Sequence, residues 1–195
     1  MLKKINIVII YLAFISFSFV FSVKENTGND VCKISNLSLA NGTQNPNGEC
    51  VETFMGEIPN SDKMISTVII FPKDNNVIEE NQPFTIRTKT INLHTGFFTD
   101  PVTQYYIFPQ TLDDNGFIQG HSHIVIQEIK NEDEILDPKA FSFFKGLDDP
   151  INEQGELNAL VDNGLPAGRY RVCTLVSSFA HQPTLMPIAQ RGNLK

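Results

Sequence analysis

Three histidines in this sequence have the residue type and spacing of a metal site. His121 and His123 are separated by one residue, and His181 is a third candidate farther along the chain. If the run from residue 121 to 129 is a β-strand, positions i and i+2 share one face of the sheet, about 6.5–7 Å apart. Imidazole nitrogens suit copper or zinc better than calcium or magnesium. The pattern therefore predicts a copper or zinc site at His121, His123 and His181.

A structural role is the alternative for the same histidines. The His-x-His pattern is short and occurs by chance, and histidines that follow a glycine at a strand entry are often ordinary hydrogen-bonded groups. In that case the protein needs no cofactor. A metal site would also require neutral imidazoles oriented by acceptors, for which Gln110, Gln127 and Gln182 are candidates. The residues alone leave both interpretations open.

Known catalytic patterns are weak in this chain. Ser122 lies between two histidines, but on a strand its side chain points to the opposite face, so neither imidazole can serve it as a base. The sequence has no Gly-x-Ser-x-Gly elbow and no Gly-rich phosphate loop. No pair among the 22 acidic residues is marked by its surroundings as a glycosidase pair. We therefore assign no catalytic residue and expect a protein that is not an enzyme.

Residues 1–22 have the pattern of a secretory signal peptide. Lys3 and Lys4 precede an apolar run over residues 5–20, and Ser22 provides a small residue for cleavage. A signal anchor is the alternative, because about 16 apolar residues approach a membrane-spanning length. The abrupt change to polar residues after Val23 favours cleavage. We expect a secreted, extracellular protein that has no membrane span after cleavage.

The mature chain divides into an Asn-rich flexible arm, residues 23–49, and one domain, residues 50–195. The formal net charge is −7 and no basic patch is visible, so a nucleic-acid partner is not expected. Asn36 and Asn41 lie in Asn-x-Ser/Thr sequons within the arm. In an exported chain these sequons predict N-glycosylation.

Three cysteines predict one disulfide and one unpaired thiol in an oxidising compartment. Cys32 and Cys50 would close a short loop-like segment within the arm. A Cys50–Cys173 bond is the alternative. Cys173 itself lies in an apolar run, which favours a buried thiol in a strand.

The rest of the chain alternates strand and turn signals at spacings of roughly ten residues. This pattern, without helix-period runs, predicts an all-β fold: an antiparallel, immunoglobulin-like β-sandwich of roughly seven to nine strands. Phe141, Phe143 and Phe144 are expected to fill its core. The predicted strands cover residues 66–71, 84–91, 105–108, 121–129, 140–144, 157–161, 169–177 and 184–189.

Four stretches together resemble a known family. They are residues 92–101, GHSHIVIQ at 120–127, residues 164–173, and HQPTLMPIAQRG at 181–192. They are similar to a family of small secreted fungal proteins of uncharacterised function, some of which carry a ribosomal-protein label. The resemblance covers residues 65–192. It implies a secreted fungal protein associated with the wall or matrix, with a further strand after Gly192, and it implies no activity.

Two functions follow as expectations. The first is a secreted, non-enzymatic fungal protein of the cell surface, the wall or a host interface. It would bind cell-wall polysaccharide or a host surface protein through one sheet face or through a loop cluster of residues 96–101 and 181–192. The alternative is a secreted copper- or zinc-binding protein that uses the His-x-His pair and His181.

Overall fold

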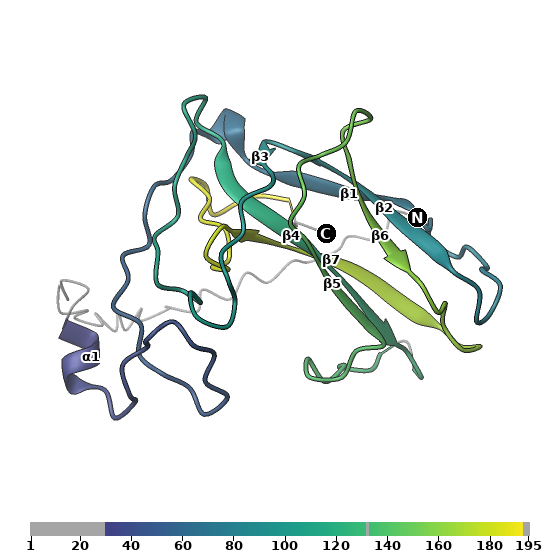
Figure 1. The fold of residues 1–195 in the computed structure, drawn as a ribbon, viewed down its shortest axis with the longest axis horizontal. Coiled ribbons are helices and arrows are strands. Elements are labelled where there is room, and N and C mark those ends of the chain that lie inside the picture. The colour runs from purple at the N-terminus through teal and green to yellow at the C-terminus, as the bar shows by residue number, and fades with distance from the viewer. Residues whose placement is uncertain (1–29, 132, 193–195) are drawn as a thin grey trace, which may run out of the picture.

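Two β-sheets packed against each other make up the body of the protein (Figure 1). The computed structural model describes residues 30–131 and 133–192. The first sheet is antiparallel and has the order β1-β2-β6. In the second sheet the long strand β4 is central, with β5 and β7 antiparallel on its two sides and the short β3 parallel to its start. The strands are β1 (Ser66–Phe71), β2 (Phe84–Ile91), β3 (Leu93–His94), β4 (Ile118–Glu128), β5 (Phe143–Leu147), β6 (Glu156–Val161) and β7 (Tyr170–Ser178).

The core lies between the two sheets and follows from the period-two alternation of the strands. On β4, Ile124 and Ile126 point inward and are fully buried. They pack against inward residues of the other sheet, of which Ile86 and Ala159 are also fully buried. The remaining members of this cluster are Leu147, Leu157 and Val161. Because even-numbered residues of β4 face the core, its odd-numbered residues must face the outer side of the second sheet.

The expected all-β sandwich is confirmed, with seven strands in two sheets among the described residues. The predicted bounds of β1 and β2 match the structure. The strands β4, β6 and β7 begin one to three residues away from the predicted positions. The immunoglobulin-like character of the sandwich stays a prediction.

Two predicted strands are wrong. Residues 105–108 form a turn, because Tyr106 has a positive φ of 60°, which ends an extended run. Residues 184–189 form no strand, and only an isolated bridge joins Pro183 to Ser177. Proline has no N–H to donate to a sheet, and Pro187 interrupts this segment as well.

The phenylalanines around β5 only partly fill the core. The strand begins later than predicted, at Phe143, which packs against the core cluster. Successive residues of a strand face opposite sides, so Phe144 points to the outer face and is 47% exposed. Phe141 precedes the strand and is also exposed. The expectation that Phe141 and Phe144 are core residues was therefore wrong.

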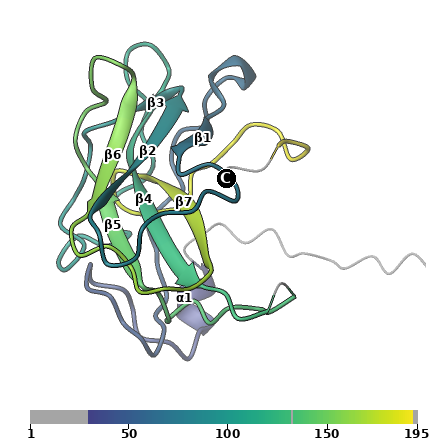
Figure 2. The same cartoon turned by 90° about the vertical axis from the view of Figure 1, so that its right-hand side faces the viewer.

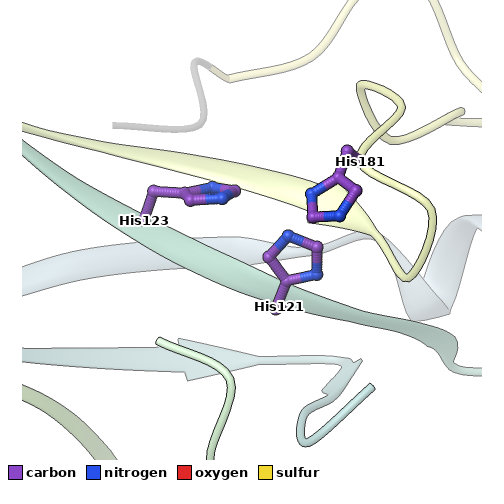
Figure 3. A group of neighbouring side chains, drawn as sticks. All are labelled: His121, His123 and His181. Atoms are coloured by element: carbon purple, nitrogen blue, oxygen red, sulfur yellow. The ribbon is translucent and has the colours of Figure 1, made fainter. Parts of the chain in front are cut away.

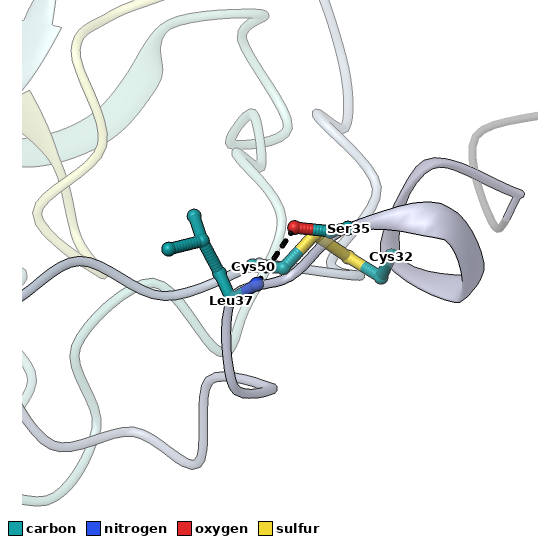
Figure 4. Close-up of a disulfide and its surroundings, with 4 residues drawn as sticks. All are labelled: Cys32, Ser35, Leu37 and Cys50. Carbon is teal, nitrogen blue, oxygen red and sulfur yellow. Dashed lines mark hydrogen bonds between the residues drawn. A yellow bond between two sulfur atoms is a disulfide. The ribbon is translucent and has the colours of Figure 1, made fainter.

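The segment before the sandwich contains α1 (Asp30–Ile34) and a 3-10 turn, η1 (Ser61–Lys63), and α1 lies at the periphery in both views (Figures 1 and 2). Cys32 and Cys50 form the expected disulfide (Figure 4), and Cys173 is unpaired. The arm contacts the body where the Tyr105 backbone N–H donates to the carbonyl of Gly42 over 2.8 Å. This part of the predicted arm is thus bonded to the domain.

Three expectations follow from the predicted export of the chain. The predicted signal peptide, residues 1–22, lies outside the described residues. Asn36 and Asn41 have exposed side chains, and their glycosylation stays a prediction. No helix within residues 30–131 and 133–192 is long and apolar enough to cross a membrane.

Candidate metal centre

The three predicted histidines come together on the outer face of the second sheet (Figure 3). His121 and His123 project from β4, and His181 comes from the turn that follows β7. One ring nitrogen of each lies within 4.8 Å of a ring nitrogen of each of the others. His121 is fully buried, and His123 and His181 are each 9% exposed. Ser122 lies on the opposite, core-facing side of the strand, as expected.

The outer face of a sheet is normally open to water, so the burial of these histidines needs an explanation. The segment of residues 95–108 covers this end of β4. The Phe97 N–H donates to the carbonyl of Gly120 (3.4 Å), and the Thr99 N–H donates to the carbonyl of Phe179 (2.9 Å). Gly120 also lets β7 approach closely, because a Cβ there would lie 2.1 Å from the Ser177 carbonyl oxygen.

A tight turn after β7 places His181 over β4. The His181 N–H donates to the Ser178 carbonyl (3.0 Å), and the Ser178 hydroxyl donates to the Gln182 side-chain oxygen (2.9 Å). His181 has a φ of 71°, in the left-handed region that side chains other than glycine seldom adopt. Such backbone strain persists where surrounding contacts over-determine it, and it gathers at functional sites.

Backbone carbonyls fix which nitrogen of each imidazole carries the proton. Nδ1 of His121 lies 3.0 Å from a carbonyl oxygen, Nδ1 of His123 lies 3.2 Å from another, and Nε2 of His181 lies 2.8 Å from a third. A carbonyl oxygen can only accept a hydrogen bond, so the nitrogen facing it must be the N–H. The lone pairs are therefore on Nε2 of His121, Nε2 of His123 and Nδ1 of His181, where a metal could use them.

The carbonyl that faces His121 belongs to Phe97, the one that faces His123 belongs to Leu175, and the one that faces His181 belongs to Thr99. None of these acceptors is a predicted glutamine. The three glutamines bond elsewhere: the Gln110 amide donates to Glu57, the Gln127 amide to Ala140, and Gln182 accepts from Ser178. Every residue has a carbonyl, so no signal in the sequence could have identified these partners.

Burial holds two of the imidazoles in the neutral form. Burial first, and then the neighbouring His123, lower the pKa of His121 to about 3, although the hydrogen bond to Phe97 opposes this. Burial likewise lowers the pKa of His123. In addition, Nε2 of His121 is buried and has no hydrogen-bond partner. A buried polar atom without a partner is uncommon and needs an explanation. A metal ion would provide one.

Aromatic rings enclose the cluster. The Phe98 ring packs edge-on against His121 and His181, with centroid separations of 4.6 and 4.9 Å. Phe144 lies beside His123 at 5.3 Å, and Tyr105 stacks near His181 at 5.8 Å. The surroundings of the three imidazoles are thus apolar on several sides.

The donor set can be compared with what copper or zinc requires. Metal–nitrogen bonds of 2.0–2.1 Å place the nitrogens of a tetrahedral or trigonal site about 3.3–3.6 Å apart. The ring nitrogens here lie up to 4.8 Å apart, so the rings must close by about 1.2–1.5 Å to share one ion. Within the described residues no cysteine or carboxylate joins the group. Three neutral nitrogen donors fit copper or zinc.

The fourth histidine lies apart from this cluster. Nδ1 of His94 lies 2.8 Å from a carboxylate oxygen of Asp113, and the His94 side chain is 47% exposed. Burial would raise the pKa of Asp113, but hydrogen bonds from the Phe117 and Asn115 N–H groups and from His94 lower it overall. This pair is a surface contact beside a turn.

A second concave feature lies near the other end of β4. It is a cavity of about 870 Å³ between the loop of residues 72–80 and the segment of residues 165–172. Its floor includes Ile126 and Val172, and its rim carries charged side chains of both signs, among them Lys73 and Glu79.

The fold and this cluster define an all-β sandwich domain with a buried group of three histidines. Residues 67–195 match the family model described as the CLU5d N-terminal domain, and the chain belongs to this family. A protein of Colletotrichum graminicola named pathogenicity cluster 5 protein d is 46% identical over 157 residues. The match covers 79% of this chain and 33% of that protein, so the chain spans about a third of the curated relative's length. No solved structure matches the chain. The expected fungal family is thereby supported.

Proposed function

We propose that this domain binds one copper or zinc ion through His121, His123 and His181. The observation that carries the proposal is the convergence of three imidazoles, each held by a backbone carbonyl through one nitrogen so that the other is left with a lone pair. Ligating histidines in proteins are oriented by this kind of hydrogen bond. The buried, unpartnered Nε2 of His121 supports the same conclusion.

The structural alternative for the histidines accounts for less. Purely structural histidines of a packed interior would be expected to satisfy both ring nitrogens or to be replaced by apolar groups of similar shape. Here three imidazoles are brought together from β4 and a strained turn. Without a ligand, three imidazoles would contribute no more to the stability of the fold than apolar aromatic side chains of similar shape would.

The test is metal analysis of the purified protein after incubation with copper or zinc and removal of loosely bound ions. We expect about one ion per chain in the wild type and in His94→Ala, which removes the exposed histidine outside the cluster. We expect loss of the ion in His123→Ala. Circular dichroism of each variant establishes that it is folded.

Two results would overturn the proposal. One is the absence of stoichiometric copper and zinc in folded wild-type protein. The other is a folded His123→Ala protein that keeps its ion as tightly as the wild type does. If His123→Ala does not fold, His123→Gln, which keeps a polar side chain of similar length, replaces it in the same measurement.

A second candidate function is action at a host interface, and the comparison with known proteins favours it. The relative from Colletotrichum graminicola is named for a pathogenicity cluster. We propose that the present protein is also exported, through residues 1–22, and acts outside the fungal cell without catalysis. Its partner would be a wall polysaccharide or a host surface protein. The loop cluster and the outer sheet face, where Phe144 and Leu175 are exposed, provide surface for contact.

Two measurements test this second candidate. N-terminal sequencing of protein recovered from the culture medium should begin near Val23, and protein retained in the cell would contradict export. Pull-downs with chitin and β-glucan should retain the protein if a wall polymer is the partner. Failure on all wall polymers would eliminate that partner and leave the host protein, to be sought by binding to intact host cells.

A further inference from the structure

We infer that the three-histidine centre prefers monovalent copper, Cu(I), to Zn(II) and Cu(II). This inference rests on the proposed function, namely that the cluster binds a metal. It comes from one juxtaposition: three neutral nitrogen donors enclosed by aromatic rings, without an anionic ligand among them.

The first argument concerns charge. Because all three donors are neutral, the complex would carry the full charge of the ion. The cost of transferring an ion from water to a low-dielectric site rises with the square of its charge, so a divalent ion costs about four times as much as a monovalent one. His121 is fully buried, and the other two ligands are 9% exposed. The site therefore penalises Zn(II) and Cu(II) far more than Cu(I).

The second argument concerns the number of ligands. Zn(II) in proteins takes four ligands, and its three-histidine sites add a water molecule, while Cu(II) favours a tetragonal set. The protein supplies three donors here, which is a complete set for Cu(I), an ion that accepts trigonal coordination. The rings of Phe98 and Phe144 pack against His121 and His123, with centroid separations of 4.6 and 5.3 Å.

The third argument concerns the enclosing rings. Aromatic rings form an apolar surrounding that does not replace the water lost by a hydrated ion. Phe98, Phe144 and Tyr105 all lie beside ligating imidazoles. Such rings favour a weakly hydrated cation over one that holds its water tightly, and Cu(I) is the former.

Cu(II) is the strongest competitor, because at a given set of ligands it ranks above Zn(II) in the general order of divalent affinities. The free thiol of Cys173 is another complication, since a thiolate also binds Cu(I). It lies on β7, in the strand that pairs with β4. The experiment must therefore compare oxidation states and also remove this thiol.

The test is an anaerobic titration of the full chain with Cu(I) in competition with bathocuproine disulfonate, beside titrations with Zn(II) and Cu(II). We expect one Cu(I) per chain and an affinity at least about 100-fold higher for Cu(I) than for either divalent ion. This ratio corresponds to a difference of roughly 2.7 kcal/mol in binding free energy. Cys173→Ser and His94→Ala should retain this Cu(I), and His123→Ala should lose it. X-ray absorption of the copper form should show three nitrogen neighbours.

Each other outcome is decisive. Equal or tighter binding of Zn(II) or Cu(II) overturns the preference for Cu(I) but leaves the proposed metal function intact. Loss of Cu(I) in Cys173→Ser assigns that copper to the thiol and also overturns the inference. Absence of all three ions from folded protein overturns the inference and the proposed function together.

Discussion

The four histidines of this protein occupy two opposite environments. His94 is half exposed and lies against the carboxylate of Asp113, whereas His121, His123 and His181 are buried together with no acid in their group. An imidazole beside a carboxylate near the surface has its polar atoms satisfied, because the carboxylate accepts a hydrogen bond from one nitrogen and water can reach the other. Three buried imidazoles that each donate to a carbonyl keep a second ring nitrogen for another partner, and Nε2 of His121 has none.

The contrast shows that burial decides what a histidine can do here. Asp113 accepts hydrogen bonds from His94 and from the N–H groups of Asn115 and Phe117 in the turn. At His121 and His123, burial lowers the pKa, so these imidazoles stay neutral and can ligate a metal. The predictions below test this contrast, and His94 serves as the internal control in the first two.

The largest expected effect is stabilisation by metal. Copper or zinc at 100 times its dissociation constant should add about 2.7 kcal/mol to the free energy of unfolding, which corresponds to roughly 5–10 °C in Tm for a domain of this size. Thermal unfolding followed by circular dichroism should show this increase in the wild type and in His94→Ala. His181→Ala should show none. An equal increase in His181→Ala would place the ion elsewhere.

Acid should destabilise the metal-free protein next most strongly. The pKa of His121 is about 3 in the folded protein, against an ordinary value of 6.5. Between these two pH values the unfolded chain binds a proton at this residue and the folded chain does not. Stability is therefore full above pH 6.5 and falls as the pH decreases towards 3, by about 1.4 kcal/mol per pH unit for this group. Between pH 7 and 5 we expect a loss of about 2 kcal/mol.

Urea unfolding in the presence of a chelator measures this loss. His121→Gln removes the titrating group and should flatten the dependence on pH, whereas His94→Gln should leave the slope as it is in the wild type. An unchanged slope in His121→Gln would contradict the assignment of a neutral, buried imidazole at this position.

An effect of similar or smaller size is expected from the ring that encloses the cluster. Phe98 makes edge-on contacts with His121 and His181, and each aromatic contact of this kind contributes about 0.5–1.5 kcal/mol. Phe98→Ala should lower the unfolding free energy of the metal-free protein by about 1–3 kcal/mol, and Phe98→Leu, which keeps most of the volume, by less. If both variants are as stable as the wild type, the ring does not support the cluster.

The smallest effect should come from the surface pair. A double-mutant cycle of His94→Ala and Asp113→Asn should give a coupling energy below about 1 kcal/mol, because the imidazole is 47% exposed. Urea unfolding of the four proteins measures it. A coupling of several kcal/mol would show that the contrast between the two environments is overstated.

Much of the fold was predictable because the strands follow simple alternation. The bounds of β1 and β2 were predicted correctly, since β1 is a β-rich run that ends before Pro72 and β2 alternates in burial with period two. The strand predicted at residues 105–108 was wrong because its aromatic residues have high strand propensity, whereas the backbone at Tyr106 adopts a positive φ. Such a backbone angle reflects the contacts of the whole loop, which the local sequence does not contain.

The three histidines of the cluster were predictable from the sequence, but their surroundings were not. The i, i+2 rule placed His121 and His123 on one face. That His181 joins them depends on a turn after β7 and on the length of that strand, which a pattern of residue types does not fix. The carbonyls of Phe97 and Thr99 and the ring of Phe98 come from a segment some twenty residues upstream of β4, the Leu175 carbonyl comes from β7, and no local signal marks them.

The position of His181 also has a consequence for how the chain is connected. An ion shared by His121 and His181 would close a loop of roughly 60 residues, which removes conformations from the unfolded chain much as a covalent cross-link does. Unlike the Cys32–Cys50 bond, which ties a short stretch of the arm, this closure would be reversible. The availability of metal in the surroundings would then set how readily β5, β6 and β7 open to a protease.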